Sequence, residues 1–129
     1  MPPRATSLFP MLSVESLDRS LAFYRDTLGG EVTYRFPSDG MPAFVVLRIG
    51  TSDLGLGLIG ASPPIHGRPL RPATGHRVEL CVYVHDVDEA VDALRADGTP
   101  VLTEPVDQPW GERLAYVEDP DGNLVMIAR

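Results

Sequence analysis

The fold is decided by two matching stretches of sequence, VESLDRSLAFYR at residues 14–25 and VHDVDEAVDALR at residues 84–95. In each stretch, apolar residues recur at helical spacing after a residue that can cap a helix, Ser16 in the first and Asp86 in the second. The second stretch follows the first by 70 residues, which aligns Leu17 with Val87 and Leu21 with Val91. The sequence therefore predicts an internal repeat built around two helices.

Working outward, apolar and alternating runs predict one strand before each helix and three strands after it. The expected strands cover residues 7–14, 32–36, 43–49 and 54–59 in the first half, and 77–84, 100–103, 113–118 and 124–128 in the second. Residues 61–76 hold four prolines and two glycines and are predicted to be a linker or surface loop. Each half alone is too small for a stable core, so we expect a single α+β domain over residues 1–129, made of repeats 7–60 and 77–129.

Composition excludes several classes of function. The net charge of −7 makes nucleic acid and anionic membranes poor partners. All 11 basic residues are arginine, which excludes Schiff-base chemistry and a P-loop lysine. A single cysteine, Cys81, excludes an intrachain disulfide and a zinc site made of several cysteines. The start of the chain lacks the apolar region of a signal peptide and no apolar run could span a membrane, so we expect a cytoplasmic protein.

The duplicated order strand–helix–strand–strand–strand resembles the vicinal oxygen chelate superfamily, which includes glyoxalase I, extradiol dioxygenases and bleomycin-resistance proteins. The resemblance rests on residues 17–24 (LDRSLAFY), on the turn DPDGN at residues 119–123, and on PWGER at residues 109–113, a loop similar to that of the bleomycin-resistance branch. It covers residues 7–129 and implies two modules that form a shared, curved-sheet cup, together with a homodimer. The scaffold hosts many chemistries, so it does not by itself define a function.

Enzymes of this superfamily carry metal ligands on four strands, and the resemblance places these positions at Phe9, at Leu56 (or Gly57 if the hairpin is one residue longer), at Glu79 and at Met126. Only Glu79 offers a ligand for a hard divalent ion. One carboxylate does not make a catalytic metal site, and the three histidines have no spacing that supplies the rest. We therefore expect no metal and no other cofactor.

The expected cavity is apolar and takes its lining from residues that share a strand face with these four positions. Glu79 has two interpretations. In the structural one it pairs with an arginine such as Arg48 or Arg113, or points outward. In the functional one it accepts a hydrogen bond from a ligand or acts on the ligand as a general base. Cys81 is expected to be a packed core thiol, and Trp110 to be either a surface cover or a wall on which a planar ligand stacks. The candidate ligand-binding residues are Phe9, Met11, Leu56, Leu58, Glu79, Cys81, Tyr83, Trp110 and Met126, with no catalytic residue assigned; the faces of Phe36, Phe44 and Tyr116 stay open.

These features favour non-catalytic binding and sequestration of a hydrophobic or aromatic small molecule, such as an antibiotic or natural product. The alternative is a metal-independent isomerase or lyase with Glu79 as general base. A metal-dependent glyoxalase or dioxygenase is the least favoured interpretation. The sequence does not reveal the ligand, nor whether the two modules pair within one chain or across a dimer.

Overall fold

The structure is a computed structural model that describes residues 4–61, 65–72, 74–76 and 78–129. The first half contains β1 (Met11–Val14), α1 (Leu17–Leu21), the π-helical turn η1 (Ala22–Thr27), β2 (Glu31–Phe36), β3 (Phe44–Ile49) and β4 (Ser52–Leu58). The second half contains β5 (Glu79–Tyr83), α2 (Val87–Ala96), β6 (Val101–Asp107), β7 (Arg113–Glu118) and β8 (Leu124–Ala128). Residues 62–64 and 73 of the expected loop, and residue 77 of an expected strand, lie outside the described residues.

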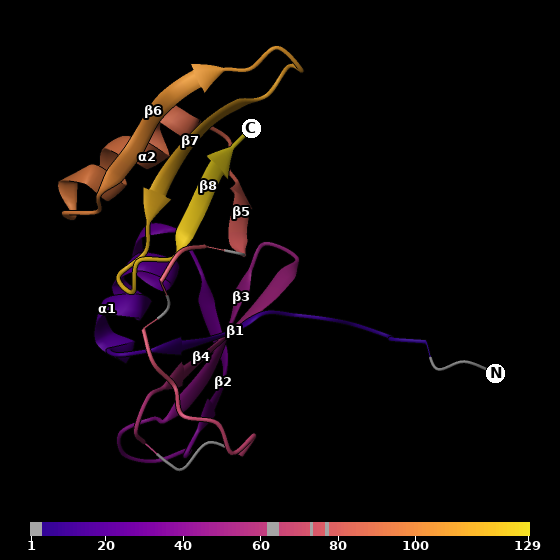
Figure 1. The fold of residues 1–129 in the computed structure, drawn as a ribbon, viewed down its shortest axis with the longest axis vertical. Helices are drawn as coiled ribbons and strands as arrows, with labels where there is room; N and C mark the ends of the chain where they lie inside the picture. The colour runs from indigo at the N-terminus through magenta and orange to yellow at the C-terminus, as the bar shows by residue number, and fades with distance from the viewer. Residues whose placement is uncertain (1–3, 62–64, 73, 77) are drawn as a thin grey trace.

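The two halves repeat one topology, which we call the first module (β1–β4 with α1 and η1) and the second module (β5–β8 with α2). The first sheet has the order β1-β4-β3-β2 and the second the order β5-β8-β7-β6. In each sheet the first strand runs parallel to the last, and the other neighbours are antiparallel. Figure 1 shows the first module in the lower half and the second in the upper half of the molecule, with both helices toward the left. The α+β class and the duplicated order predicted from the sequence are confirmed.

Both predicted helix caps are present. The Ser16 side chain accepts a hydrogen bond from the backbone N–H of Arg19 at 3.2 Å, and the Asp86 side chain accepts one from that of Glu89 at 3.0 Å. The first helix differs from the expected regular helix because it widens into η1, where the Thr27 hydroxyl donates to the carbonyl of Ala22.

Strands β1, β5 and β6 differ most in length from the sequence prediction, and β5 covers Glu79–Tyr83 where residues 77–84 were expected. Strand β1 is shorter than residues 7–14 and begins at Met11, although the Pro10 carbonyl still accepts a hydrogen bond from Gly55 N–H. Strand β6 is longer than residues 100–103 and runs to Asp107, because its pairing with β7 continues past Pro105 through two irregular steps. The expected strands 113–118 and 124–128 match β7 and β8.

One face of each sheet packs on the helices and forms the core. Its fully buried members include Val14, Leu47 and Leu56 in the first module, and Val91, Leu94 and Ile127 in the second. Because side chains alternate along a strand, the other face of each sheet points away from the helices, and we call it the open face. Large apolar side chains are exposed there, among them Met11, Tyr34, Phe36 and Tyr83. The open faces are therefore where a ligand or a partner has room to bind.

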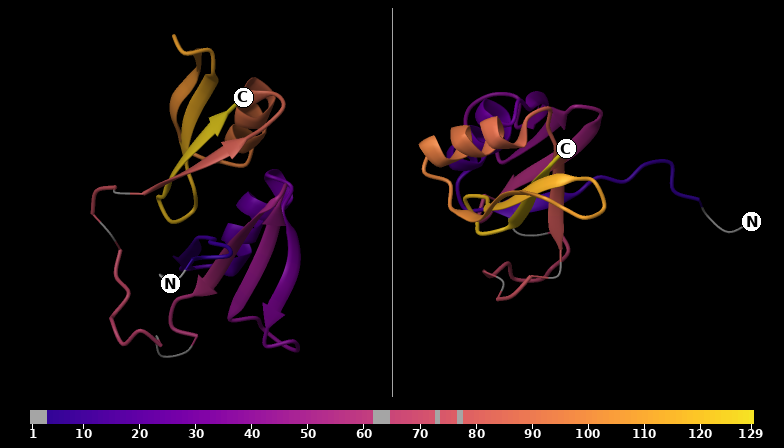
Figure 2. Two further views of the ribbon diagram at one scale, coloured as in Figure 1. Left: turned by 90° about the vertical axis from the view of Figure 1, so that its right-hand side faces the viewer. Right: turned by 90° about the horizontal axis from the view of Figure 1, so that it is seen from above.

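The two modules meet through the first helix, α2 and the turn that joins β7 to β8 (Figure 2). The buried Tyr24 hydroxyl donates to Asp119 Oδ2 at 2.6 Å across this junction. The Thr27 hydroxyl donates to Asp97 at 2.6 Å, and these two residues are 70 positions apart, which makes them equivalent in the repeat. The ends of the two helical segments therefore contact each other at equivalent positions of the repeat.

Candidate functional site

The open face of the second sheet gathers most of the predicted ligand-binding residues. Strand register places Cys81 beside Met126, and Met126 beside Tyr116, in one row across β5, β8 and β7. Glu79 and Tyr83 lie two residues to either side of Cys81 on the same face of β5. The Tyr116 hydroxyl donates to Glu79 Oε1 at 2.7 Å, so the two side chains form one hydrogen-bonded unit.

The end of the β6–β7 hairpin brings Trp110 to this face through Glu112. The loop closes tightly: the Gln108 N–H donates to the Glu112 carbonyl at 2.7 Å, and Gly111 has a positive φ of 104°. The Glu112 carboxylate accepts hydrogen bonds from Trp110 Nε1 at 2.8 Å and from the Tyr83 hydroxyl at 2.7 Å. Glu112 thus fixes the position of two aromatic side chains from different parts of the chain.

These hydrogen bonds reinforce the protonation states that the groups of the open face already have at neutral pH. The bond to Glu112 raises the pKa of Tyr83 to about 12, and the bond to Glu79 raises the pKa of Tyr116 to about 12. The hydrogen bonds from Tyr83 and Trp110 lower the pKa of Glu112. At neutral pH both phenols are therefore protonated donors, and Glu112 is an anion. The face offers carboxylate acceptors inside an aromatic and thioether surface.

Cys81 differs from its prediction as a packed core thiol, because it is exposed on the open face. The physical reason is that nothing within the described part of the chain covers this face of β5. Partial burial of the thiol is the largest effect on its pKa and raises it, and the nearby carboxylates Glu112 and Glu79 act in the same direction. A raised pKa keeps the thiol protonated at neutral pH, which makes it a poor nucleophile.

The first sheet has an open face of its own. Met11 pairs with Gly55, Phe44 with Gly57, and Tyr34 with Val46 across the strands, and Phe36 lies beside Phe44. A Cβ atom added to Gly55 would lie 3.0 Å from Met11 Cγ and 3.2 Å from the ring of Phe44. The glycine therefore lets the Phe44 ring approach the backbone of β4. The sequence did not determine which strand face Phe36, Phe44 and Tyr116 occupy; in the structure all three lie on open faces, Phe36 and Phe44 on the first sheet and Tyr116 on the second.

The prediction that Leu56 and Leu58 face the cavity is wrong. Leu56 is fully buried in the core, where its neighbour Leu12 also packs, and Leu58 packs partly against the same core. The segment Leu54–Leu58 alternates leucine and glycine, and burial of the leucines against the helices determines which face they occupy. The open-face positions of β4 are therefore Gly55 and Gly57.

The structure brings Glu79, Cys81, Tyr83, Trp110 and Met126 together on the second sheet, whereas Met11 belongs to the first sheet and Phe9 to neither. Phe9 lies just before β1 and is 41% exposed. Glu79 has Tyr116 as its partner and neither of the expected arginines, since Arg48 pairs with Asp53 and Arg113 with Asp88 and Asp107. Sequence reasoning missed Glu112, although its place two residues after Trp110 in a tight loop was a usable signal.

The four positions that resemblance assigns to metal ligands do not fit a hard divalent ion. Leu56 is in the core, its neighbour Gly57 has no side chain, and Phe9 has no donor atom. Glu79 supplies one carboxylate, and the thioether of Met126 is a soft ligand. In the described residues no group of three or more histidine, cysteine, aspartate or glutamate side chains lies close enough to hold a metal ion. The described residues also include no helix long and apolar enough to cross a membrane.

Comparison with known proteins agrees with this architecture. Residues 8–127 match the family model described as the Glyoxalase/Bleomycin resistance protein/Dioxygenase superfamily. The chain belongs to that superfamily. No curated protein matches it.

Solved structures of the same fold cover almost the whole chain. TioX from Micromonospora sp. ML1 is 25% identical, with a TM-score of 0.74, and the match covers 97% of this chain and 98% of that one. A member of the superfamily from Sphaerobacter thermophilus DSM 20745 is 27% identical, with a TM-score of 0.71 and 97% of each chain covered. Hypothetical protein SA1046 from S. aureus is 24% identical, with a TM-score of 0.78, covering 98% of this chain and 95% of that one.

Proposed function

We propose that this protein binds and sequesters a hydrophobic or aromatic small molecule, of the kind found among antibiotics and natural products, without transforming it. The observation that carries the proposal is the surface formed by Tyr83, Trp110, Tyr116 and Met126 around the carboxylates of the second sheet. Aromatic and thioether side chains favour stacking of a planar ligand, and a few fixed polar groups orient it. The carboxylates and the net charge of −7 favour a ligand that is neutral or cationic.

The binding unit in this proposal is a homodimer in the cytoplasm. Tyr83 and Trp110 are each 66% exposed, so a ligand on a single open face would bury only one of its sides. The first sheet exposes its own apolar residues, including Tyr34 and Phe36. A second copy that sets its first sheet opposite this second sheet would enclose a ligand between two apolar walls.

Fluorescence of Trp110 tests the proposal, because it is the only tryptophan in the chain. A panel of antibiotics that includes bleomycin and planar aromatic compounds is titrated into the protein, and at least one compound is expected to quench the fluorescence at micromolar concentration. M126A should weaken that binding about fivefold or more through lost apolar contact. The matched control is M41A, since Met41 is exposed and lies outside the second sheet. No quenching across the panel, or equal effects of the two variants, would contradict the proposal.

A second candidate is a metal-independent isomerase or lyase. It is favoured by the 2.7 Å hydrogen bond between the Tyr116 hydroxyl and Glu79, which joins a possible base to a neutral donor. Glu79 would remove a proton from the ligand and Tyr116 would donate a hydrogen bond to the oxygen on which charge develops. E79Q separates the two functions. If the bound compound is recovered chemically changed by the native protein and unchanged by E79Q, with binding retained, the protein is an enzyme.

A further inference from the structure

One end of the open face of the second sheet carries two carboxylates in the same row. Strand register sets Glu79 of β5 beside Leu124 of β8, and Leu124 beside Glu118 of β7. The row therefore crosses three strands and has an acidic side chain on each side of the leucine. It lies where β5 and β8 begin and β7 ends.

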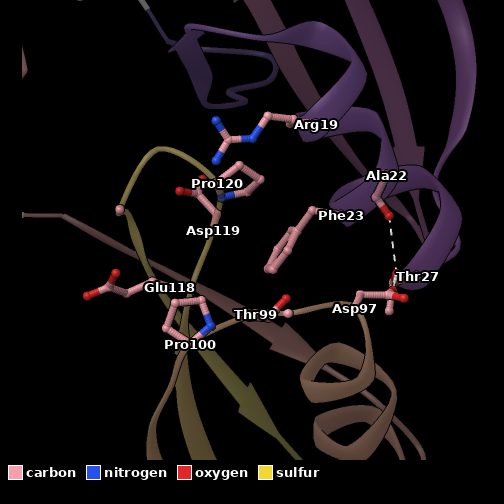
Figure 3. A pocket seen from close by; sticks show the side chains of 12 residues that line it. Arg19, Ala22, Phe23, Thr27, Asp97, Thr99, Pro100, Glu118, Asp119 and Pro120 are labelled. Carbon is pink, nitrogen blue, oxygen red and sulfur yellow. Dashed lines mark hydrogen bonds between the residues drawn. The ribbon is translucent and has the colours of Figure 1, made fainter.

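The side chain of Glu118 belongs to this open face. Its neighbour Val117 is fully buried in the core, so alternation along β7 places Glu118 on the opposite side of the sheet. Glu118 also borders a cavity between the modules, the junction pocket, which is lined by residues of α1, η1, the end of α2 and the β7–β8 turn. Figure 3 shows the Phe23 ring at the centre of this pocket and the Glu118 side chain turned away from it.

The other end of the open face carries Glu112. Tyr83 follows Glu79 by four residues along β5, a rise of about 13 Å, and the Tyr83 hydroxyl donates to Glu112 at 2.7 Å. One Glu112 oxygen accepts from Tyr83 and the other from Trp110, and each retains a lone pair for a further donor. The carboxylates at the two ends of the face are therefore too far apart to share one small cation.

The surface between these two ends is apolar and aromatic. Its middle row consists of Cys81, Met126 and Tyr116. Tyr83 lies beyond this row, and Tyr83 and Trp110 are each 66% exposed. An exposed surface of aromatic and thioether groups favours contact with an apolar body, most of all a planar one. The carboxylates thus flank a surface that favours an aromatic ligand for an independent reason.

The positive charges of the second module lie on its other side, toward the helix. Arg113 donates to Asp88 of α2 at 2.8 Å. Arg95 of α2 pairs with Asp92 at 3.2 Å. Hydrogen bonds from Arg113 lower the pKa of Asp88, and the charge of Arg129 contributes to the same effect. The arginines that the structure describes in this module therefore gather on the helix side, and the open face of its described strands carries a net negative charge.

We propose that the ligand of the open face is an aromatic dication, a planar apolar body with one positively charged group at each end. This inference rests on the proposed function and names the class of its ligand. One cationic group pairs with Glu79 and Glu118, and the other pairs with Glu112. The aromatic body lies over Met126 between the two ends. An aliphatic diamine matches the charges but not the aromatic surface, so it binds more weakly.

The test compares three compounds that share one planar body. These are 4′,6-diamidino-2-phenylindole with an amidinium at each end, 6-amidino-2-phenylindole with one amidinium, and the neutral 2-phenylindole. Binding to the full chain is measured by calorimetry at low salt. We expect each amidinium to tighten binding roughly threefold to tenfold, so that the dication binds about tenfold to a hundredfold more tightly than the neutral compound. Added salt should reduce this difference, and 1,10-diaminodecane should bind at least about tenfold more weakly than the aromatic dication.

Variants assign the two ends of the dication. E112Q removes the charge at one end and the double variant E79Q/E118Q removes it at the other. Each should lower the affinity for the dication to about that for the monocation and leave the affinity for 2-phenylindole unchanged. The matched controls are E89Q and E89Q/D92N, which remove the same charges from exposed positions of α2 and should change each affinity by less than about twofold. Melting curves confirm that each variant is folded.

The outcomes separate this inference from the proposed function. Equal binding of the three phenylindoles would overturn the dication but leave sequestration of an aromatic molecule in place. Equal effects of the site and control variants, or tighter binding of diaminodecane than of the aromatic dication, would also overturn it. If no phenylindole binds while another compound of the antibiotic panel quenches Trp110, only this inference is wrong. If nothing in either set binds, the proposed function is wrong as well.

Discussion

The hydrogen bond between Tyr24 and Asp119 should be a principal link between the two modules, and Y24F tests this. The tyrosine is 1% exposed and the aspartate 3%, and their oxygen atoms are 2.6 Å apart. A hydrogen bond to a charged group contributes about 1.5–3 kcal/mol to stability. Asp119 Oδ2 keeps Asn123 Nδ2 as a donor in the variant, which limits the loss. We therefore expect Y24F to lower the free energy of unfolding by about 2 kcal/mol.

Urea unfolding followed by circular dichroism measures this loss, and it corresponds to a fall in Tm of about 6–10 °C for a chain of this size. Y34F is the matched control, because Tyr34 is half exposed, and its effect should stay within about 0.5 kcal/mol. A double-mutant cycle with D119N isolates the pair itself, and a coupling of about 1–2 kcal/mol is expected. If Y24F is as stable as the native protein, the bond does not hold the modules together and the reasoning is refuted.

The same bond predicts how stability depends on alkaline pH. Burial, followed by the charge of Asp119 and the hydrogen bond to it, raises the pKa of Tyr24. The folded state therefore retains a proton that the unfolded state loses once the pH passes the unfolded pKa of about 10. The stabilisation is complete below about pH 10 and declines as the pH rises further. Urea midpoints measured on either side of pH 10 should fall more steeply for the native protein than for Y24F.

Two further predictions concern the open faces. G55A should lower the free energy of unfolding by about 1–3 kcal/mol, because the added methyl group meets Met11 and the Phe44 ring at 3.0–3.2 Å. G57A is the control and should lower it less, since the nearest contact of its methyl group is at 3.8 Å. Urea unfolding of the two variants measures the difference, and equal losses of stability would contradict this account of the packing. Ultraviolet titration should show that Tyr116 ionises near pH 12 in the native protein and closer to pH 10 in E79Q. The reason is that the carboxylate of Glu79 accepts a hydrogen bond from the phenol and so stabilises its protonated form. An unchanged titration curve would mean that the two side chains do not interact.

The repeat illustrates what patterns along the chain can establish. Ser16 and Asp86 cap their helices as expected, and the two halves share one strand order, because capping and periodicity act between residues that are close in sequence. The assignment of Leu56 failed for a different reason. Alternating leucine and glycine define two faces but do not say which one meets the core, and the packed helices decided that.

The candidate site shows the same division. Glu79, Cys81 and Tyr83 could be placed on one face of β5 from alternation alone. Their partners could not be predicted, because Tyr116 and Glu112 lie 37 and 29 residues away along the chain and reach them only when the sheet and its hairpin have formed. The junction pocket likewise joins residues of both modules, and no local pattern records that arrangement.

By itself the sequence determined the class of fold, the repeat and the helix starts, since these follow from interactions within a few residues. Only the tertiary structure decided which face of β4 is buried and which groups form hydrogen bonds with Glu79 and Tyr83. It also decided how Tyr24 and Asp119 join the modules. Those features depend on contacts between distant segments, and a chain acquires such contacts only when its sheets and helices pack together.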